Sequence, residues 1–334
     1  MVRFSPPAAG LPPPAGSALL WLSLVVLLVT ASGARCWRPG DEVLPQMLPP
    51  TPSLQQLTDE VNQNTSLVGS EWATGRLAVP GAPSIPVSLA MEQPLRFRLR
   101  ASTAITGTEV DLGSNDELFW LWAKRQQPPA LYFCRHDQFL ASSARSILPV
   151  EPQWIIEAMG LVRFDPSEQP QGPSPVGANR LQIRSVRHGP AGDMTKTTVI
   201  DSRSGAVLEQ HLYDARGYRL ASAITSRHHR DPTTGALLPR HIEIQCPGTQ
   251  LDLQIDLDEM QINALGPQSA GLWTKPDYPG FPNVNLAQAG PQMVGPAPIP
   301  GPSQTVGSAA NYGGAPPNYG VVPSQPPAGY RSYP

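Results

Sequence analysis

The chain has 334 residues, of which 40% are hydrophobic and 15% are charged, and its formal net charge at pH 7 is −2. This length is enough for one or two domains with an apolar core. A nearly neutral chain without basic runs produces no long-range field that attracts nucleic acid, so the composition argues against nucleic-acid binding.

The first feature along the chain is an uncharged, mostly apolar run over residues 18–31. Arg3 precedes this run and small residues follow it at 31–34, which is the pattern of a secretory signal peptide with its cleavage site. A transmembrane helix usually needs about 18–20 apolar residues, so a permanent membrane span is the weaker interpretation. We therefore expect residues 1–35 to be a signal peptide and the mature protein to be exported to the periplasm or cell envelope.

Cys36 follows the predicted signal peptide and is a candidate lipidation site. A bacterial lipidation motif has an aliphatic residue three positions before the cysteine and a small residue directly before it, whereas this chain has Gly33 and Arg35 there. Acylation would anchor the protein to a membrane. Cleavage after Gly33 or Ala34 would instead release it into the envelope, and the sequence leaves both alternatives open.

Two helices are expected. After a Pro-rich tether at 36–50, the domain at 51–275 begins with Ser53, which starts a capping-box pattern and a short run of apolar residues at helical spacing. The second helix is expected over 151–161, where an apolar stripe ends at a glycine.

Most of the remaining domain has a period of two, which is typical of strands. Residues 95–101 alternate apolar side chains with arginines. Residues 251–258 alternate apolar side chains with aspartates and a glutamine. Met260 and Ile262 fall on the opposite parity, which predicts a bulge near Glu259. Further strands are expected at 108–112, 117–124, 130–135, 181–187, 196–201, 206–214, 218–227 and 237–245, with a surface loop at 166–175.

These elements predict a mainly β (α+β) fold. Strands joined by short turns form an antiparallel meander whose apolar face must be covered. Two helices are too few to cover about ten strands as a separate layer. We therefore expect a curled antiparallel sheet that forms an open half-barrel, with a few helices plugging its concave side.

The C-terminal region, 276–334, has a different composition. Residues 281–334 contain twelve Pro and eight Gly, and Arg331 is their only charge. Such a segment cannot bury enough apolar surface to offset its ordering entropy, so we expect a disordered Pro/Gly/Tyr-rich tail.

The sequence carries no signature of catalysis or of a cofactor site. It has no nucleophile elbow, His-Glu-x-x-His motif, P-loop or dinucleotide fingerprint, so we expect neither an enzyme nor a bound cofactor. His228 and His229 are adjacent, and on a strand they would point to opposite faces, so we expect no metal site. Cys134 and Cys246 are a candidate disulfide in an exported chain, and two buried free thiols are the alternative.

The order of helix, long meander, inserted helix and returning strands resembles the LolA/LolB-like lipoprotein carrier superfamily, over about residues 50–265. The stretches that carry the resemblance are 75–79, 94–101 and, above all, 110–122, where Asp-Leu-Gly-Ser-Asn is followed by a Phe-Trp pair as in a group of bacterial envelope lipoproteins. This resemblance implies a half-barrel that holds a lipid or a lipoprotein acyl chain against an apolar concave face. The candidate wall or lid residues are Phe97, Leu99, Trp120, Trp122, Phe133, Trp154 and Met159.

Two alternatives accompany this interpretation. The seven apolar side chains could simply fill the interior, in which case the protein would be a membrane-anchored structural or interaction module whose C-terminal tail binds a partner. Arg96, Arg98 and Arg100 could contact lipid phosphates, or they could form a solvated strand face.

Overall fold

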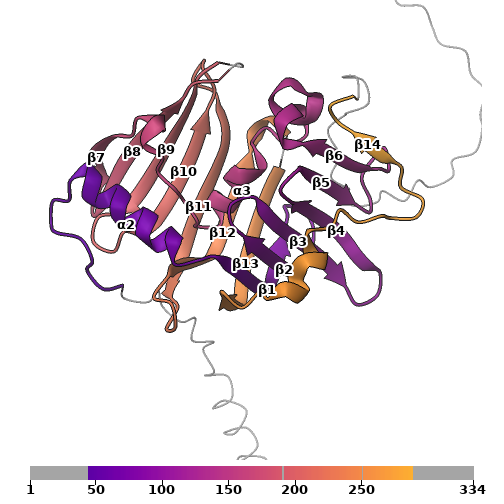
Figure 1. The fold of residues 1–334 in the computed structure, drawn as a ribbon, viewed down its shortest axis with the longest axis horizontal. Helices are drawn as coiled ribbons and strands as arrows, with labels where there is room; N and C mark the ends of the chain where they lie inside the picture. The colour runs from indigo at the N-terminus through magenta and orange to yellow at the C-terminus, as the bar shows by residue number, and fades with distance from the viewer. Residues whose placement is uncertain (1–43, 190–191, 250, 289–334) are drawn as a thin grey trace, which may run out of the picture. The chain divides into compact units, whose positions relative to one another are not determined.

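In a computed structural model of the protein, residues 44–189, 192–249 and 251–288 are described. The predicted signal peptide, Cys36 and most of the predicted tail lie outside these residues. The described part contains a 14-stranded sheet, open at both edges and curled, with helices on its concave face (Figure 1). The expected curled antiparallel sheet with an open half-barrel shape is confirmed.

The sheet consists of two meanders that meet at its centre. The first runs outward through β1 (Ser70–Ala78), β2 (Ile85–Glu92), β3 (Arg96–Thr103), β4 (Gly107–Ser114), β5 (Leu118–Ala123) and β6 (Leu131–Arg135). The second begins at the opposite edge and returns through β7 (Gln171–Gly177), β8 (Arg180–Arg187), β9 (Met194–Asp201), β10 (Val207–Tyr213), β11 (Arg219–Arg230), β12 (Leu237–Cys246) and β13 (Leu251–Ile262). All these pairs are antiparallel, and β13 pairs with β1.

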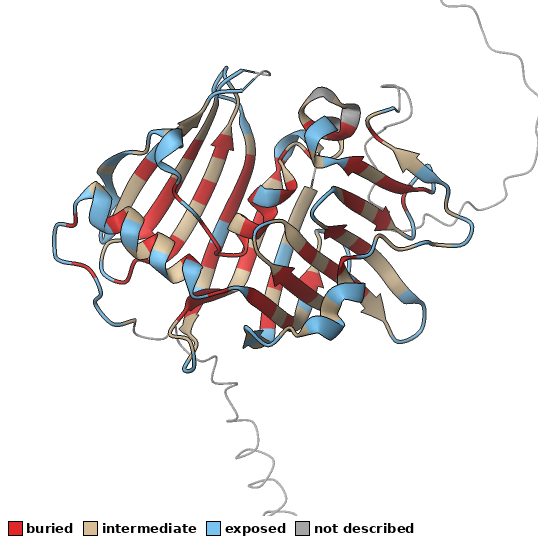
Figure 2. Cartoon of the chain, in the orientation of Figure 1, coloured by how far each residue is buried: buried red, intermediate tan, exposed pale blue. Residues whose placement is uncertain are grey.

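The connection from one edge of the sheet to the other crosses the concave face. It carries the short 3₁₀ helices η1 (His136–Ala141) and η2 (Ser143–Ser146), the helix α3 (Pro152–Ala158) and η3 (Pro166–Glu168). Apolar side chains of η1, η2 and α3 join those of β1–β6 and β10–β13 in the principal core. Figure 2 colours the buried residues red. The crossing connection therefore plugs the concavity, as expected for an inserted helix.

The helix α2 (Leu54–Ser66) covers the other end of the same face. Ser53 accepts a hydrogen bond from the N–H of Gln56, and the Gln56 side chain accepts one from the N–H of Ser53, so the predicted capping box is formed. Leu57 and Val61 pack against strands β8–β10 in a second apolar cluster. Leu48 also belongs to this cluster and is 5% exposed, so the fold begins within the segment expected to be a tether.

The fold also extends past the expected domain boundary at residue 275. After η5 (Pro267–Trp273), the chain forms the short strand β14 (Asn283–Asn285), which pairs in parallel with β6. Leu286 is 1% exposed. Residues 276–288 therefore belong to the fold. Their aromatic and aliphatic side chains bury apolar surface, which the average composition of the whole tail did not indicate.

Two other local expectations meet different outcomes. The predicted bulge is present: Thr74 pairs with Glu259 and Gly75 with Leu257, so Asp258 is the extra residue. The expected surface loop at 166–175 instead contributes η3 and the edge strand β7. The prolines of β7 are tolerated because an edge strand leaves one row of N–H groups unpaired.

Gly75 lies at the bulge, where a Cβ atom would collide with the main-chain oxygen of Asp256. We expect Gly75→Ala to lower the free energy of unfolding by about 1–3 kcal/mol, since main chain must move to make room. Gly248→Ala is the control, because a Cβ there meets nothing within 4 Å. Urea denaturation measures both, and equal effects would contradict this explanation.

Candidate functional site

A pocket of about 420 Å³ opens on the concave face between α3, the segment that follows it, and strands β8–β10. Its apolar part is formed by Trp154 of α3, Met194 of β9 and Leu212 of β10, which belong to the principal core or pack against it. The antiparallel register aligns Ser185, Lys196 and Leu212 in one row across the three strands. At this pocket, therefore, the principal core reaches the surface.

Charged side chains surround this apolar floor. Lys196 is buried, with its Nζ 3.0 Å from Glu157 Oε2 and 3.5 Å from Glu168 Oε2. Burial raises the pKa of Glu157, the Lys196 ammonium acts in the opposite direction, and the nearby charge of Glu168 raises the pKa further. Burial works against the charge of Lys196, but the two carboxylates outweigh it and raise its pKa.

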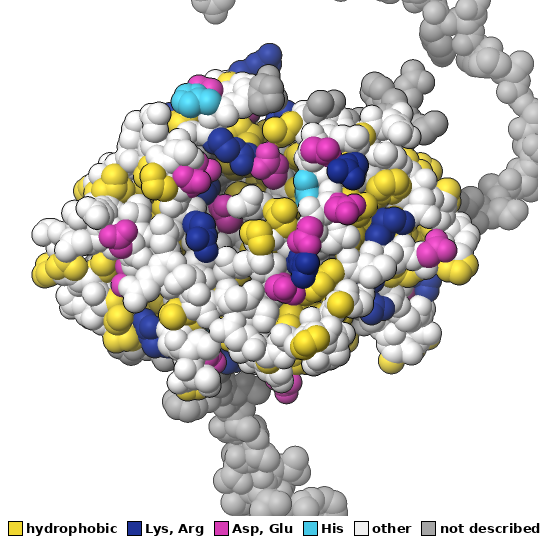
Figure 3. Space-filling model, viewed as in Figure 1, with side chains coloured by type: hydrophobic (Ala, Val, Ile, Leu, Met, Phe, Trp, Pro, Cys, Tyr) yellow, Lys and Arg dark blue, Asp and Glu magenta, His cyan; other side chains and the backbone are white. Residues whose placement is uncertain are grey.

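The rest of the rim also pairs opposite charges. Arg187 of β8 lies 2.8 Å from Glu151, the residue that precedes α3. On the face drawn in Figure 3, acidic, basic and hydrophobic side chains lie next to one another over the middle of the fold. An apolar floor with a charged rim suits an amphipathic molecule, which buries its hydrocarbon part and keeps its polar end hydrated.

Four of the seven predicted ligand-binding residues lie in the principal core on the concave face. Trp154 lines the pocket. Phe97, Leu99 and Met159 are 1–4% exposed and pack in the same core. These four residues come from β3, α3 and the end of α3 and lie on one side of the sheet, and their contact with a ligand stays a prediction.

The other three, Trp120, Trp122 and Phe133, lie on the opposite face. Successive strand residues alternate between faces, so Trp120 points away from the core that contains its neighbour Phe119. The C-terminal segment, residues 266–288, contributes aromatic cover here: Tyr278 stacks on Trp122 with ring centroids 3.8 Å apart. The seven side chains therefore do not form one wall.

A buried carboxylate is the centre of this outer-face cluster. Asp111 of β4 is fully buried and lies 2.7 Å from a guanidinium nitrogen of Arg98. It also accepts hydrogen bonds from Trp120 Nε1 at 3.2 Å and from the Tyr278 hydroxyl at 2.7 Å. Burial and the hydrogen bond to Asp111 both raise the pKa of Tyr278.

The arginine row of β3 consequently has a structural role that the sequence did not reveal. Arg98 is partly buried, pairs with Asp111, and donates to the main-chain oxygen of Leu272 at 3.1 Å. Arg96 pairs with Glu92 at 3.1 Å. Arg98, with its side chain 11% exposed, therefore departs from the solvated strand face of the sequence interpretation, whereas Arg96 and Arg100, with side chains 34% and 44% exposed, agree with it.

Cys134 and Cys246 are buried free thiols in the structure, which corrects the candidate disulfide in favour of its alternative. Both pack in the principal core, and burial raises the pKa of each thiol, that of Cys246 to about 12. His228 lies with its Nε2 2.9 Å from the main-chain oxygen of Val207. Across the described ranges, no group of three or more His, Cys, Asp or Glu residues is arranged to hold a metal ion.

Sequence reasoning missed Lys196 and Glu157 as site residues. The available signal was parity: Lys196 is two residues from Thr198 and four from Ile200, on the strand face that packs inward. A lysine on that face requires a carboxylate partner, and Glu157 lies on the inserted helix that crosses it.

The sequence matches no protein-family model and no curated protein. Solved structures with a similar fold include a LolA superfamily protein from Nitrosomonas europaea, with 10% identity and a TM-score of 0.42 over 67% of this chain and 99% of that one. A DUF1329 family protein from Desulfovibrio piger has 10% identity and a TM-score of 0.42 over 66% of this chain and 97% of that one. These distant likenesses assign neither a ligand nor a partner.

Among the helices of the described residues, none has the length and apolar character needed to cross a membrane.

Proposed function

We infer that the chain is an exported, non-enzymatic protein of the cell envelope that binds an acyl chain or another apolar ligand in the concave-face pocket. The observation that carries this proposal is the pocket itself, where Trp154, Met194 and Leu212 bring the principal core to the surface. Its volume of about 420 Å³ is within the usual range of small-molecule sites. Each methylene buried there would contribute about 0.8 kcal/mol.

The charged rim defines how such a ligand would lie. The hydrocarbon part would contact Trp154 and Met194, and the polar end would remain near the Arg187–Glu151 pair. Lys196, Glu157 and Glu168 already neutralise much of one another's charge, so they leave the floor accessible to an apolar group. Binding would therefore follow from burial of apolar surface, not from a reaction.

The proposal predicts that a charge at the pocket floor weakens binding of an alkyl chain. We expect Met194→Glu to weaken binding of a fluorescent fatty acid by at least about tenfold, because an ionised carboxylate cannot be buried against hydrocarbon without cost. Met194→Leu is the matched control and should bind like the unchanged protein, since it preserves an apolar side chain of similar volume. Fluorescence titration measures the affinities.

Equal affinity in the Met194→Glu and Met194→Leu variants would contradict this site. Native mass spectrometry of the purified protein provides a second test, with a co-purified lipid as the expected result. Thermal unfolding of both variants checks that they are folded. Met194 is partly exposed at the start of β9, so both substitutions should be tolerated.

The alternative function, an interaction module with a filled core, has one structural observation in its favour. The centre of the concave face is occupied by η1, η2 and α3, whose side chains pack in the principal core. A protein that binds no alkyl chain in either test would support this alternative. Its predicted partner-binding tail is 276–334, and the part from residue 289 onward lies outside the described residues.

Anchoring through Cys36 is a separate part of the proposal, and Cys36 also lies outside the described residues. Mass spectrometry of the mature N-terminus would distinguish an acylated Cys36 from cleavage after Gly33 or Ala34. An unmodified N-terminus would remove the membrane anchor from the proposal and leave the ligand site unaffected.

A further inference from the structure

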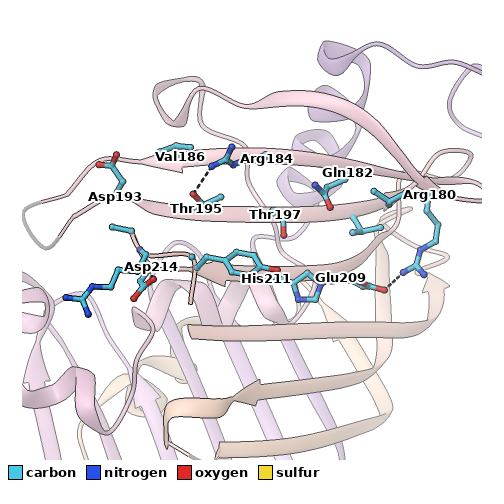
Figure 4. Close-up of a pocket in the computed structure, with 16 residues that line it drawn as sticks. Arg180, Gln182, Arg184, Val186, Asp193, Thr195, Thr197, Glu209, His211 and Asp214 are labelled. Atoms are coloured by element: carbon cyan, nitrogen blue, oxygen red, sulfur yellow. Dashed lines mark hydrogen bonds and ion pairs between the residues drawn. The ribbon is translucent and has the colours of Figure 1, made fainter. Parts of the chain in front are cut away.

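The outer face of strands β8–β10 contains a second groove, of about 860 Å³ (Figure 4). Its lining residues alternate along each strand with the residues that face α2 and α3, so the groove lies on the other side of the sheet from the concave pocket. Polar side chains predominate in it, including Gln182, Arg184, Thr195, Thr197 and His211. The groove is therefore unsuited to an alkyl chain.

The strand register arranges three of these side chains in a row. Arg184 of β8 is opposite Thr197 of β9, and Thr197 is opposite His211 of β10. Neighbouring strands are about 4.8 Å apart, so the row spans about 10 Å. The adjacent row ends at Tyr213, which is opposite Thr195. A guanidinium, a hydroxyl, an imidazole and an aromatic ring are thus presented together on one rigid surface.

One side of the groove is held in place by a partly buried network. Glu209 accepts a hydrogen bond from Arg180, and its other carboxylate oxygen lies 3.1 Å from His211 Nε2. These two contacts lower the pKa of Glu209 even though its burial acts in the opposite direction. Glu209 therefore orients His211 and is itself committed to Arg180.

The other carboxylates of the groove, those of Asp193 and Asp214, also have partners of their own. Asp193 pairs with His188 at 2.8 Å. Asp214 accepts hydrogen bonds from the N–H groups of Arg216 and Tyr218 in its own turn, both at 2.9 Å. Neither carboxylate is directed at Arg184 by any of these contacts.

Arg184 is the residue of this row whose positive charge has no ion-pair partner among the described residues. Its side chain makes one hydrogen bond, at 3.5 Å to Thr195 Oγ1, and has no carboxylate partner among the residues that the structure describes (Figure 4). A guanidinium presents several donors in a fixed plane, which matches a carboxylate or a phosphate. An anionic group on a ligand would complete its hydrogen bonding.

We propose that this outer groove binds an anionic carbohydrate, a sugar acid or a sugar phosphate. Arg184 holds the anionic group, the Thr197 hydroxyl and the Gln182 amide pair with sugar hydroxyls, and Tyr213 supplies a ring beside them. The site is independent of the alkyl-binding pocket, because the two lie on opposite faces of β8–β10.

Isothermal titration calorimetry of the full chain tests the proposal with glucuronate and glucose 6-phosphate as probes, and with glucose, acetate and inorganic phosphate as their separate parts. We expect at least one of the two anionic sugars to bind, and to bind more tightly than any separate part. Arg184→Gln should weaken this binding by at least about tenfold, and Thr197→Val should weaken it by a smaller factor. Arg125→Gln is the control, because Arg125 is 70% exposed and pairs with Glu109, away from the groove.

Three results would overturn the proposal: no binding of either anionic sugar, binding that Arg184→Gln leaves unchanged, or inorganic phosphate or acetate binding as tightly as the corresponding sugar. Binding of the fluorescent fatty acid by Arg184→Gln should equal that of the unchanged protein. A loss of fatty-acid binding in this variant would contradict the independence of the two sites.

Discussion

Asp111→Asn is expected to lower the free energy of unfolding by about 3–5 kcal/mol, the cost of breaking a buried ion pair by removing one partner. Asp111 is fully buried, and the side chain of Arg98, 2.7 Å away, is 11% exposed. An asparagine is of nearly the same size but carries no charge. The Arg98 guanidinium would keep little contact with water and would lose its ion-pair partner, and Tyr278 would lose its charged acceptor.

Urea denaturation followed by tryptophan fluorescence measures this effect, and Glu117→Gln is the matched control. Glu117 is also an acidic residue in an ion pair, but its side chain is 74% exposed and lies 3.9 Å from Arg135. Such a pair contributes at most about 1 kcal/mol. If Asp111→Asn costs no more than Glu117→Gln, the central role of Asp111 is wrong.

The contribution of Asp111 extends to the C-terminal segment. Tyr278 donates to its carboxylate, and Arg98, which Asp111 holds, donates to the main chain of Leu272. Trp273 Nε1 donates to Glu92 Oε2 at 3.0 Å on the neighbouring strand. A single buried carboxylate thus helps to attach residues 266–288 to the outer face, where they cover Trp120 and Trp122.

Local patterns predicted the elements of this fold well. The capping box at Ser53 depends on residues three positions apart, and the bulge opposite Gly75 appears as a change of parity within one strand. Both signals are contained in a few consecutive residues. The curled sheet also followed from the sequence, since many alternating strands with two helices leave few other ways to cover an apolar face.

Pairings between distant residues were not predictable in this way. Asp111 and Tyr278 are 167 positions apart, and no local pattern shows that the C-terminal segment pairs with β6 through β14 and returns to the outer face. The same limit affected the candidate site. Alternation shows that Trp120 and Phe119 face opposite ways, but it does not show which of them faces the core.

The location of the pocket was likewise hidden by its long-range origin. Lys196 and Glu157 meet because the connection between the two sheet edges crosses the concave face, a route that no local pattern specifies. Trp154 was identified because it is part of a helical apolar stripe. Met194 and Leu212 become pocket residues only through the register of β9 with β10.

Glu71 is expected to make the protein less stable as the pH rises from about 4.5 to about 8. It is 1% exposed in β1, its cross-strand neighbours are Met91 and Ile262, and its Oε2 has no hydrogen-bond partner among the described residues. Burial raises its pKa from 4.5 to about 8. In this range the unfolded chain releases the proton that the folded protein retains, so the free energy of unfolding decreases with pH.

Glu71→Gln should remove this decrease, because an amide of similar shape has no proton to lose. Below about pH 4.5 the carboxyl is protonated in both states, and we expect the variant and the unchanged protein to have similar stability. Near pH 9 we expect the variant to be more stable by about 5 kcal/mol, since the pKa is raised from 4.5 to about 8 and each unit of pKa shift corresponds to about 1.4 kcal/mol. Urea denaturation across this range measures the difference between the two proteins, in which the titration of all other groups cancels.

Glu117→Gln should give no comparable difference, since Glu117 is exposed. Parallel stability curves for Glu71→Gln and the unchanged protein would show that the core tolerates an ionised Glu71.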